Sequence, residues 1–221
     1  TQGSGSAVPD EAPVITQRES SVETGNTITI NAAENATANV TISDVNINTS
    51  GEIKAAVSTG GKGNVNIELD GTNTLKSGRE HAGLEKSGDG KLTITDENEN
   101  GKLIATGGDY GAGIGGSDHG NGNDITITGG EITAIGGRQG AGIGGGFYGN
   151  GSNITIAGGK VTATGGDYGA GIGGGSQGNG KNITITGGEV TAAGGTNGAG
   201  IGGGLQKNGE KITVSGDATL K

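Results

Sequence analysis

The chain lacks cysteine, methionine and tryptophan, and its 221 residues include only two prolines, one phenylalanine and three tyrosines. Without cysteine it forms no disulfide bonds and no thiolate metal sites. Apolar residues make up only 29% of the chain, which argues against a conventional globular core. Two prolines are too few for collagen or for a proline-rich linker. Glycine, by contrast, fills 54 positions, about three times its usual share.

Basic residues are also scarce, with 14 Lys and Arg against 23 Asp and Glu and a formal net charge of −9. No basic stripe with interleaved aromatic residues is present, so we expect no nucleic-acid partner. No apolar run approaches the roughly 18 residues of a membrane span, so we expect no membrane insertion. The chain starts without Met and stops in a strand-like pattern at Thr219–Leu220, so we expect a fragment of a larger protein.

Short sequence blocks recur every 29 residues in the second half of the chain. The block Gly-Ala-Gly-Ile-Gly-Gly begins at Gly111, Gly140, Gly169 and Gly198. The block Ile-Thr-Ile, finally Ile-Thr-Val, begins at Ile125, Ile154, Ile183 and Ile212. A fixed period of this length indicates a repeat architecture. Degenerate copies of the same unit continue upstream.

Each unit predicts three short β-strands. Ile125–Thr128 and Ile132–Ala134 alternate apolar and polar residues and are rich in β-branched side chains, as half-buried strands are. A third, glycine-rich strand is expected around Ala112–Ile114. Glycine pairs such as Gly129–Gly130 suit sharp corners between strands, because glycine tolerates positive φ. The apolar residues show no helical period of 3.6, so helices are not expected.

These features predict an all-β fold, a single right-handed parallel β-helix with coils of about 29 residues and three strands each. We expect a linker or irregular N-terminal cap at residues 1–25 and the β-helix at 26–221, irregular over 26–100 and regular over 101–221. Coils stacked at about 4.8 Å place equivalent residues in ladders along the axis. Inward ladders are expected at Ile125/Ile154/Ile183/Ile212, Ile127/Ile156/Ile185/Val214 and Ile114/Ile143/Ile172/Ile201, and a turn-stabilising ladder at Asn121/Asn150/Asn179/Asn208.

Calcium is the one cofactor that the sequence suggests. Gly120–Asp124 resembles a calcium-roll turn, but a roll needs Asp in each coil and the later coils carry Asn153, Asn182 and Lys211. In an alternative, acidic residues of the first half converge on one ion: Asp96, Glu97 and Glu99 with Asp70 or Asp89. Otherwise these carboxylates lie on solvated loops. Because calcium needs six to eight oxygen ligands, the ligand count favours no metal, and we expect no cofactor.

Two further alternatives follow from the predicted fold. Polysaccharide-cleaving β-helix enzymes resemble this architecture, but they cluster Asp with Arg or Lys on one face. Here the two histidines, His81 and His119, fall in different coils without a nucleophile partner, so we expect no enzyme. Outward threonine ladders resemble those of ice-binding solenoids, but Ala157 and Ser215 interrupt the array.

Sequence variation is concentrated in two pairs of positions that flank the Gly-Ala-Gly block, and all four aromatic residues fall there. Exposed rings stack on apolar sugar faces while polar neighbours meet the hydroxyls, so these pairs are the candidate ligand-binding residues. Tyr110 and Tyr168 lie two coils apart, about 9.6 Å, which an extended glycan spans. In the alternative, the pairs are tolerant loop tips on a spacer. The candidate residues are Asp109, Tyr110, Arg138, Gln139, Phe147, Tyr148, Asp167 and Tyr168.

The glycine-rich blocks resemble β-helix segments of large cell-surface proteins of Gram-positive bacteria. The run His81–Ile94 is similar to carbohydrate-binding β-helix domains of clostridial secreted proteins, some of which bind pectic polysaccharide with calcium. This resemblance covers about residues 26–221 and implies an extracellular, wall-associated setting and a glycan partner. We therefore expect a non-enzymatic surface module, a glycan-binding adhesin or, alternatively, a purely structural stalk.

Overall fold

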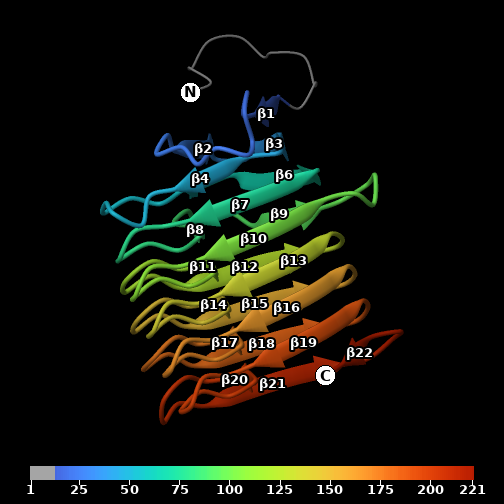
Figure 1. The fold of residues 1–221 in the computed structure, drawn as a ribbon. Helices are drawn as coiled ribbons and strands as arrows, with labels where there is room; N and C mark the ends of the chain where they lie inside the picture. Colours follow the sequence, from blue (N-terminus) through green and yellow to red (C-terminus); the bar gives the residue numbers. More distant parts are fainter. Residues whose placement is uncertain (1–12) are drawn as a thin grey trace.

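The computed structural model describes residues 13–221, which form a parallel β-solenoid without a helix (Figure 1). Its strands form three parallel sheets, and each of seven coils adds one strand to each sheet. The chain runs through every coil in the order sheet C, sheet A, sheet B, and then rises to the next coil. The predicted parallel β-helix, with coils of about 29 residues and three strands each, is confirmed.

The strands of each sheet follow one another along the solenoid axis. Sheet C contains β2 (Ile28–Ala32), β5 (Val57–Gly61), β8 (Leu84–Lys86), β11 (Ile114–Gly115), β14 (Ile143–Gly144), β17 (Ile172–Gly173) and β20 (Ile201–Gly202). Sheet A contains β1 (Val14–Thr16), β3 (Thr37–Ser43), β6 (Asn64–Asp70), β9 (Leu92–Thr95), β12 (Gly122–Ile127), β15 (Gly151–Ile156), β18 (Gly180–Ile185) and β21 (Gly209–Val214). Sheet B contains β4 (Asn46–Asn48), β7 (Thr72–Lys76), β10 (Lys102–Thr106), β13 (Glu131–Ile135), β16 (Lys160–Thr164), β19 (Glu189–Ala193) and β22 (Thr219–Leu220). Coil 1 runs from β2 to β4, and coil 7 from β20 to β22.

The core is a narrow stack of aliphatic ladders. Ile125, Ile154 and Ile183 align in register on sheet A and are fully buried, as the period-two pattern predicts. Ile212 and Val214 of the last coil keep the register of the predicted ladders but are 40% and 44% exposed. Both belong to β21, the last strand of sheet A, so no coil among the described residues covers their outer side.

The predicted asparagine ladder closes the corner between sheets C and A. The side-chain Oδ1 of Asn121 accepts a hydrogen bond from the backbone N–H of Asn150 at 2.8 Å. Asn150 does the same for Asn179, and Asn179 for Asn208. Each amide therefore satisfies a turn donor of the next coil, which is a structural role.

The N-terminal segment is only partly described. Residues 1–12 of the predicted linker or cap lie outside the described residues, but β1 pairs in parallel with β3 at the end of sheet A. A bridge between Thr24 and Ile47 ties the following segment to coil 1. No periodic pattern in the sequence indicated this strand.

Loop length changes abruptly between coils 3 and 4, at the corner that joins sheet C to sheet A. The paired core residues Leu84 and Leu92 are eight positions apart in coil 3, whereas Ile114 and Ile125, their partners in coil 4, are eleven apart. Later coils keep the longer corner. The corner of coil 4 therefore has three more residues than the corner of coil 3 beside it.

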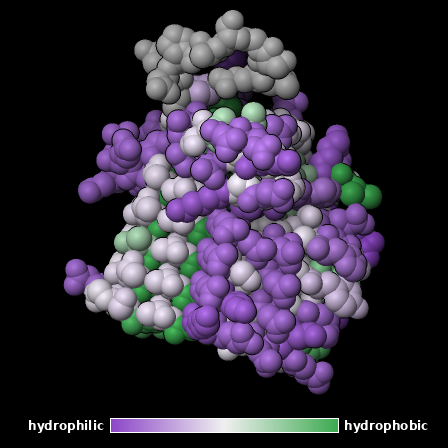
Figure 2. All heavy atoms as spheres, turned by 180° about the vertical axis from the view of Figure 1, so that it is seen from behind, coloured by the Kyte–Doolittle hydropathy of each residue, from purple (hydrophilic) through white to green (hydrophobic). Residues whose placement is uncertain are grey.

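The outer surface is divided lengthwise. Seen from behind, pale and green columns run along the axis beside a broad hydrophilic face (Figure 2). Pale colour marks residues of intermediate hydropathy, and threonine is one that recurs in register on the outer side of sheet A, at Thr126, Thr155 and Thr184. The solenoid therefore presents lines of like residues rather than scattered ones.

Candidate functional site

The two variable pairs of each repeat meet on one edge of the solenoid. The backbone N–H of Phe147 donates to the carbonyl oxygen of Tyr110 at 2.8 Å, although the two residues belong to different corners of the chain. Ser176 and Gln139, and Leu205 and Tyr168, are joined in the same way at 2.7 and 2.9 Å. The sequence positions that vary therefore form a single continuous strip along the axis, which we call the variable edge.

Four rings cluster on the variable edge. The ring centroids of Phe147 and Tyr148 are 4.1 Å apart, and those of Tyr110 and Phe147 are 5.6 Å apart. The imidazole of His119 stacks on Tyr148 at 5.0 Å with an interplanar angle of 12°. Tyr148 is 53% exposed, although aromatic side chains ordinarily gain from burial. We call Tyr110, His119, Phe147 and Tyr148 the aromatic platform.

Charged side chains flank these rings in alternating sign. The guanidinium of Arg79 lies 4.9 Å from the ring centroid of Tyr110 and donates to its hydroxyl at 2.8 Å. Arg138 lies 5.5 Å from the ring of Tyr168 and 3.5 Å from the carboxylate of Asp167. These cation–π contacts and ion pairs favour particular orientations of the partly buried rings of Tyr110 and Tyr168.

The structure brings only some of the predicted site residues together. Tyr110, Phe147 and Tyr148 join the aromatic platform, and Asp109 lies 3.9 Å from Arg79. Tyr168, Arg138 and Asp167 form a second group along the same edge, which shares no ring contact with the platform among the described residues. Gln139 contributes backbone hydrogen bonds that link coils.

Two residues of the site were missed by sequence reasoning. Arg79 belongs to an irregular coil, so it was not compared with the variable pairs of the regular repeats. Its place two residues before His81, which stands 30 residues before Gly111, was the available signal. His119 stands 29 residues before Tyr148, at the equivalent position of the preceding repeat, and this spacing was the available signal that the two rings lie together.

A recess of about 300 Å³ opens beside the platform, between coils 3 and 4. The longer corner of coil 4 supplies one wall with Ser117, Gly120 and Asn123, and the shorter corner of coil 3 supplies the other. Three charged side chains line it: Lys86, Asp89 and Asp124. Lys86 is 7% exposed and donates to the carbonyl oxygen of Gly88 at 2.7 Å.

The burial of Lys86 makes the stability of the protein depend on pH. Burial lowers the pKa of this ammonium, and the nearby carboxylates of Asp124 and Asp89 only partly oppose that effect. Between the lowered pKa and the ordinary value near 10.4, the unfolded chain binds more protons than the folded one, so stability from this residue rises with pH. We expect the free energy of unfolding of the parent to increase, relative to that of Lys86→Thr, between pH 7 and pH 10.

Urea denaturation at the two pH values measures this difference. Lys62→Thr, at a side chain that is 65% exposed, controls for the loss of one positive charge. The prediction is contradicted if the difference in free energy of unfolding between the parent and Lys86→Thr stays constant with pH. It is also contradicted if the difference between the parent and Lys62→Thr changes with pH by the same amount.

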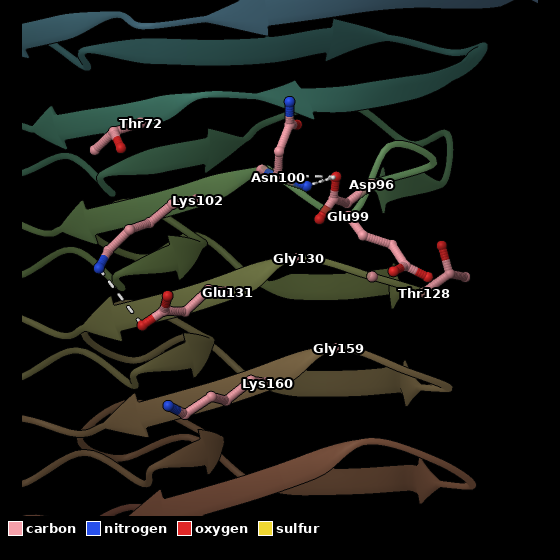
Figure 3. A pocket seen from close by; sticks show the side chains of 12 residues that line it. Thr72, Asp96, Glu99, Asn100, Lys102, Thr128, Gly130, Glu131, Gly159 and Lys160 are labelled. Carbon is pink, nitrogen blue, oxygen red and sulfur yellow. Dashed lines mark hydrogen bonds and ion pairs between the residues drawn. The ribbon is translucent and has the colours of Figure 1, made fainter.

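A larger hollow of about 520 Å³ lies at the corner between sheets A and B, under the long loop that connects β9 to β10 (Figure 3). Its polar groups are largely engaged with one another. The Oδ1 of Asp96 accepts from the backbone N–H of Asn100 and Gly101 at 3.2 and 3.1 Å, and Lys102 lies 3.5 Å from Glu131. This hollow therefore offers fewer free polar groups than its size suggests.

The carboxylates considered for calcium are separated in the structure. Glu68 accepts from the backbone N–H of Glu97 at 2.7 Å, and Asp70 accepts from the side chain of Asn100 at 2.9 Å. Asp89 lies at the recess on a different corner. Residues 13–221 bring no three His, Cys, Asp or Glu side chains together in a group suited to a metal ion. Asp124 instead accepts from the side chain of Asn153 at 2.9 Å.

Fold and site together define a β-helix repeat protein with one variable edge. A family model described as a beta helix repeat matches the chain in four segments: residues 99–118, 125–147, 154–176 and 183–205. These matches lie on the regular coils, so the chain carries a β-helix repeat segment. No curated protein and no solved structure matches the chain. Within residues 13–221 there is also no helix with the length and apolar character to cross a membrane.

Proposed function

We propose that the protein is a non-enzymatic, extracellular module of a larger surface protein, and that it binds glycans through the aromatic platform. The observation that carries this proposal is the cluster of four rings on the variable edge, with Tyr148 more than half exposed. Such rings bind the apolar faces of sugars, and the flanking Arg and Asp side chains match their hydroxyls.

The scaffold holds the residues of the aromatic platform in place before a ligand binds. Backbone hydrogen bonds join each corner loop of the variable edge to the next coil, as between Phe147 and Tyr110. The platform is therefore preorganised, and binding costs little ordering of the protein. The resemblance to cell-surface β-helix proteins supports the extracellular setting and the glycan partner.

A glycan array tests the proposal. We expect the parent protein to be retained by at least one glycan, and Tyr148→Ala to weaken that retention by about tenfold or more, because one stacking face is removed. Phe147→Ala is expected to act in the same direction, because it removes the ring that joins Tyr110 to Tyr148.

Val14→Ala is the matched control, since Val14 is 62% exposed and lies on β1 at the end of sheet A, away from the corners that form the variable edge. It removes apolar surface without touching the rings, so its retention should equal that of the parent. A protein that is purely a stalk would be retained by no glycan, and that result would reject the proposed function.

A further inference from the structure

The recess between coils 3 and 4 contains a charge that the fold itself does not require. Lys86 stands in register with Thr59 of the preceding coil, which is 2% exposed and uncharged. A buried ammonium costs stability unless other groups compensate it. Proteins tolerate such costs mainly at functional sites, so this position calls for a functional explanation.

A buried polar atom without a partner belongs to Asn123, a residue that lines the recess. The Oδ1 of Asn123 is buried and has no hydrogen bond among the described residues. Buried acceptors are normally satisfied, and an exception needs an explanation such as a bound molecule. Asn123 and Asp124 line the recess together, so a group that enters it lies beside both side chains.

The set of polar groups selects a ligand chemistry. Lys86 is a donor, whereas the carboxylates of Asp89 and Asp124 are acceptors. Two carboxylates disfavour an anion, and the ammonium among them disfavours a metal cation. A hydroxyl group donates and accepts at once, so neighbouring hydroxyls satisfy both kinds of partner.

We propose that the recess is a subsite for the adjacent hydroxyls of one neutral sugar ring. The inference rests on the proposed glycan-binding function and specifies its ligand class. The recess of about 300 Å³ is at the small end of ligand pockets, which suits a single ring rather than an oligosaccharide.

The subsite and the aromatic platform share one loop. Ser117 and Gly120 line the recess, and His119 between them stacks on Tyr148. A glycan with one ring in the recess therefore extends over this loop onto the platform. The longer corner of coil 4 therefore supplies one wall of the recess and also carries His119.

Two variants each remove a charged group of the subsite. Each introduces a side chain that the solenoid already has at the equivalent position of another coil. Lys86→Thr introduces the side chain of Thr59, its partner one coil earlier. Asp124→Asn introduces the side chain found at Asn153 and Asn182, which share its left-handed backbone with φ near 55°. The ladder bond from Asn153 to position 124 survives that change, because Asn also offers an acceptor oxygen.

The experiment titrates isotope-labelled protein with the methyl glycosides of glucose, galactose and mannose and follows backbone amide resonances by NMR. We expect at least one of them to shift Gly88, Gly120 and Asn121, and each variant to weaken that binding by about tenfold or more. Asn182→Ala, in the same ladder but two coils away, should bind like the parent. Sodium galacturonate and glucosamine should bind more weakly than the neutral sugar.

The outcomes separate the two proposals. Shifts that are unchanged in Lys86→Thr, or that appear only with a charged sugar, or no shifts at all, would overturn the subsite. If Tyr148→Ala abolishes glycan-array retention while Lys86→Thr does not alter it, the platform stands and the subsite is wrong. If the neutral sugar shifts the recess but no variant of the platform changes retention, the subsite stands and the platform is wrong.

Discussion

Gly144→Ala is expected to lower the free energy of unfolding by more than about 3 kcal/mol. Gly144 has a φ of +135°, where residues with a Cβ are strained, and a Cβ there would lie 1.9 Å from the carbonyl oxygen of Gly173. That oxygen also accepts the backbone hydrogen bond from Gly145 at 2.9 Å. A single methyl group therefore forces two coils apart and breaks the bond between them.

Gly51→Ala is the control for this prediction. No heavy atom lies within 4 Å of a Cβ built on Gly51, and its φ is not in the left-handed range, so the change should be near neutral. Urea denaturation followed by circular dichroism measures both variants. Equal midpoints for Gly144→Ala and Gly51→Ala would show that glycine stacking on sheet C contributes little to stability.

Ile154→Ala is expected to cost about 2–5 kcal/mol, the usual range for a buried large-to-small change. Ile154 is fully buried between Ile125 and Ile183 in the ladder of sheet A. The backbone of β15, which carries Ile154, is held by parallel pairing with β12 on one side and β18 on the other. The cavity therefore cannot be closed by a shift of the neighbouring coils.

The adjacent residue provides a matched control on the same strand. Thr155 is only partly buried and faces outward, so Thr155→Ala should cost about 1 kcal/mol or less. The comparison uses the same denaturation experiment. If Thr155→Ala lowers the free energy of unfolding as much as Ile154→Ala does, the assignment of inward and outward faces is contradicted.

The regular coils could be predicted from the sequence because their information is local and repeated. Ile125, Thr126 and Ile127 alternate as a half-buried strand must, and the period of 29 residues fixes their register with later coils. The third strand was harder, since β11 has only Ile114 and Gly115. Close approach of coils, rather than a side-chain pattern, holds that strand in its sheet.

The site was less predictable, because it depends on contacts between unlike coils. Variation within the repeat located Tyr110 and Tyr148, but it could not show that their corners touch. Lys86 resembles any surface lysine in the sequence. Its burial, like that of Thr59 in the preceding coil, arises only once the coils are stacked.

The surface charges have a longer repeat than the core beneath them. Lys102, Glu131, Lys160 and Glu189 stand in register on sheet B, and Arg79, Asp109, Arg138 and Asp167 alternate on the variable edge. The aliphatic ladders return every coil, whereas the signs of charge return every second coil. Gain or loss of one coil would keep the core in register but place like charges on neighbours, which repel. Gain or loss of two coils would preserve both, so the unit by which this solenoid lengthens without electrostatic conflict is a pair of coils.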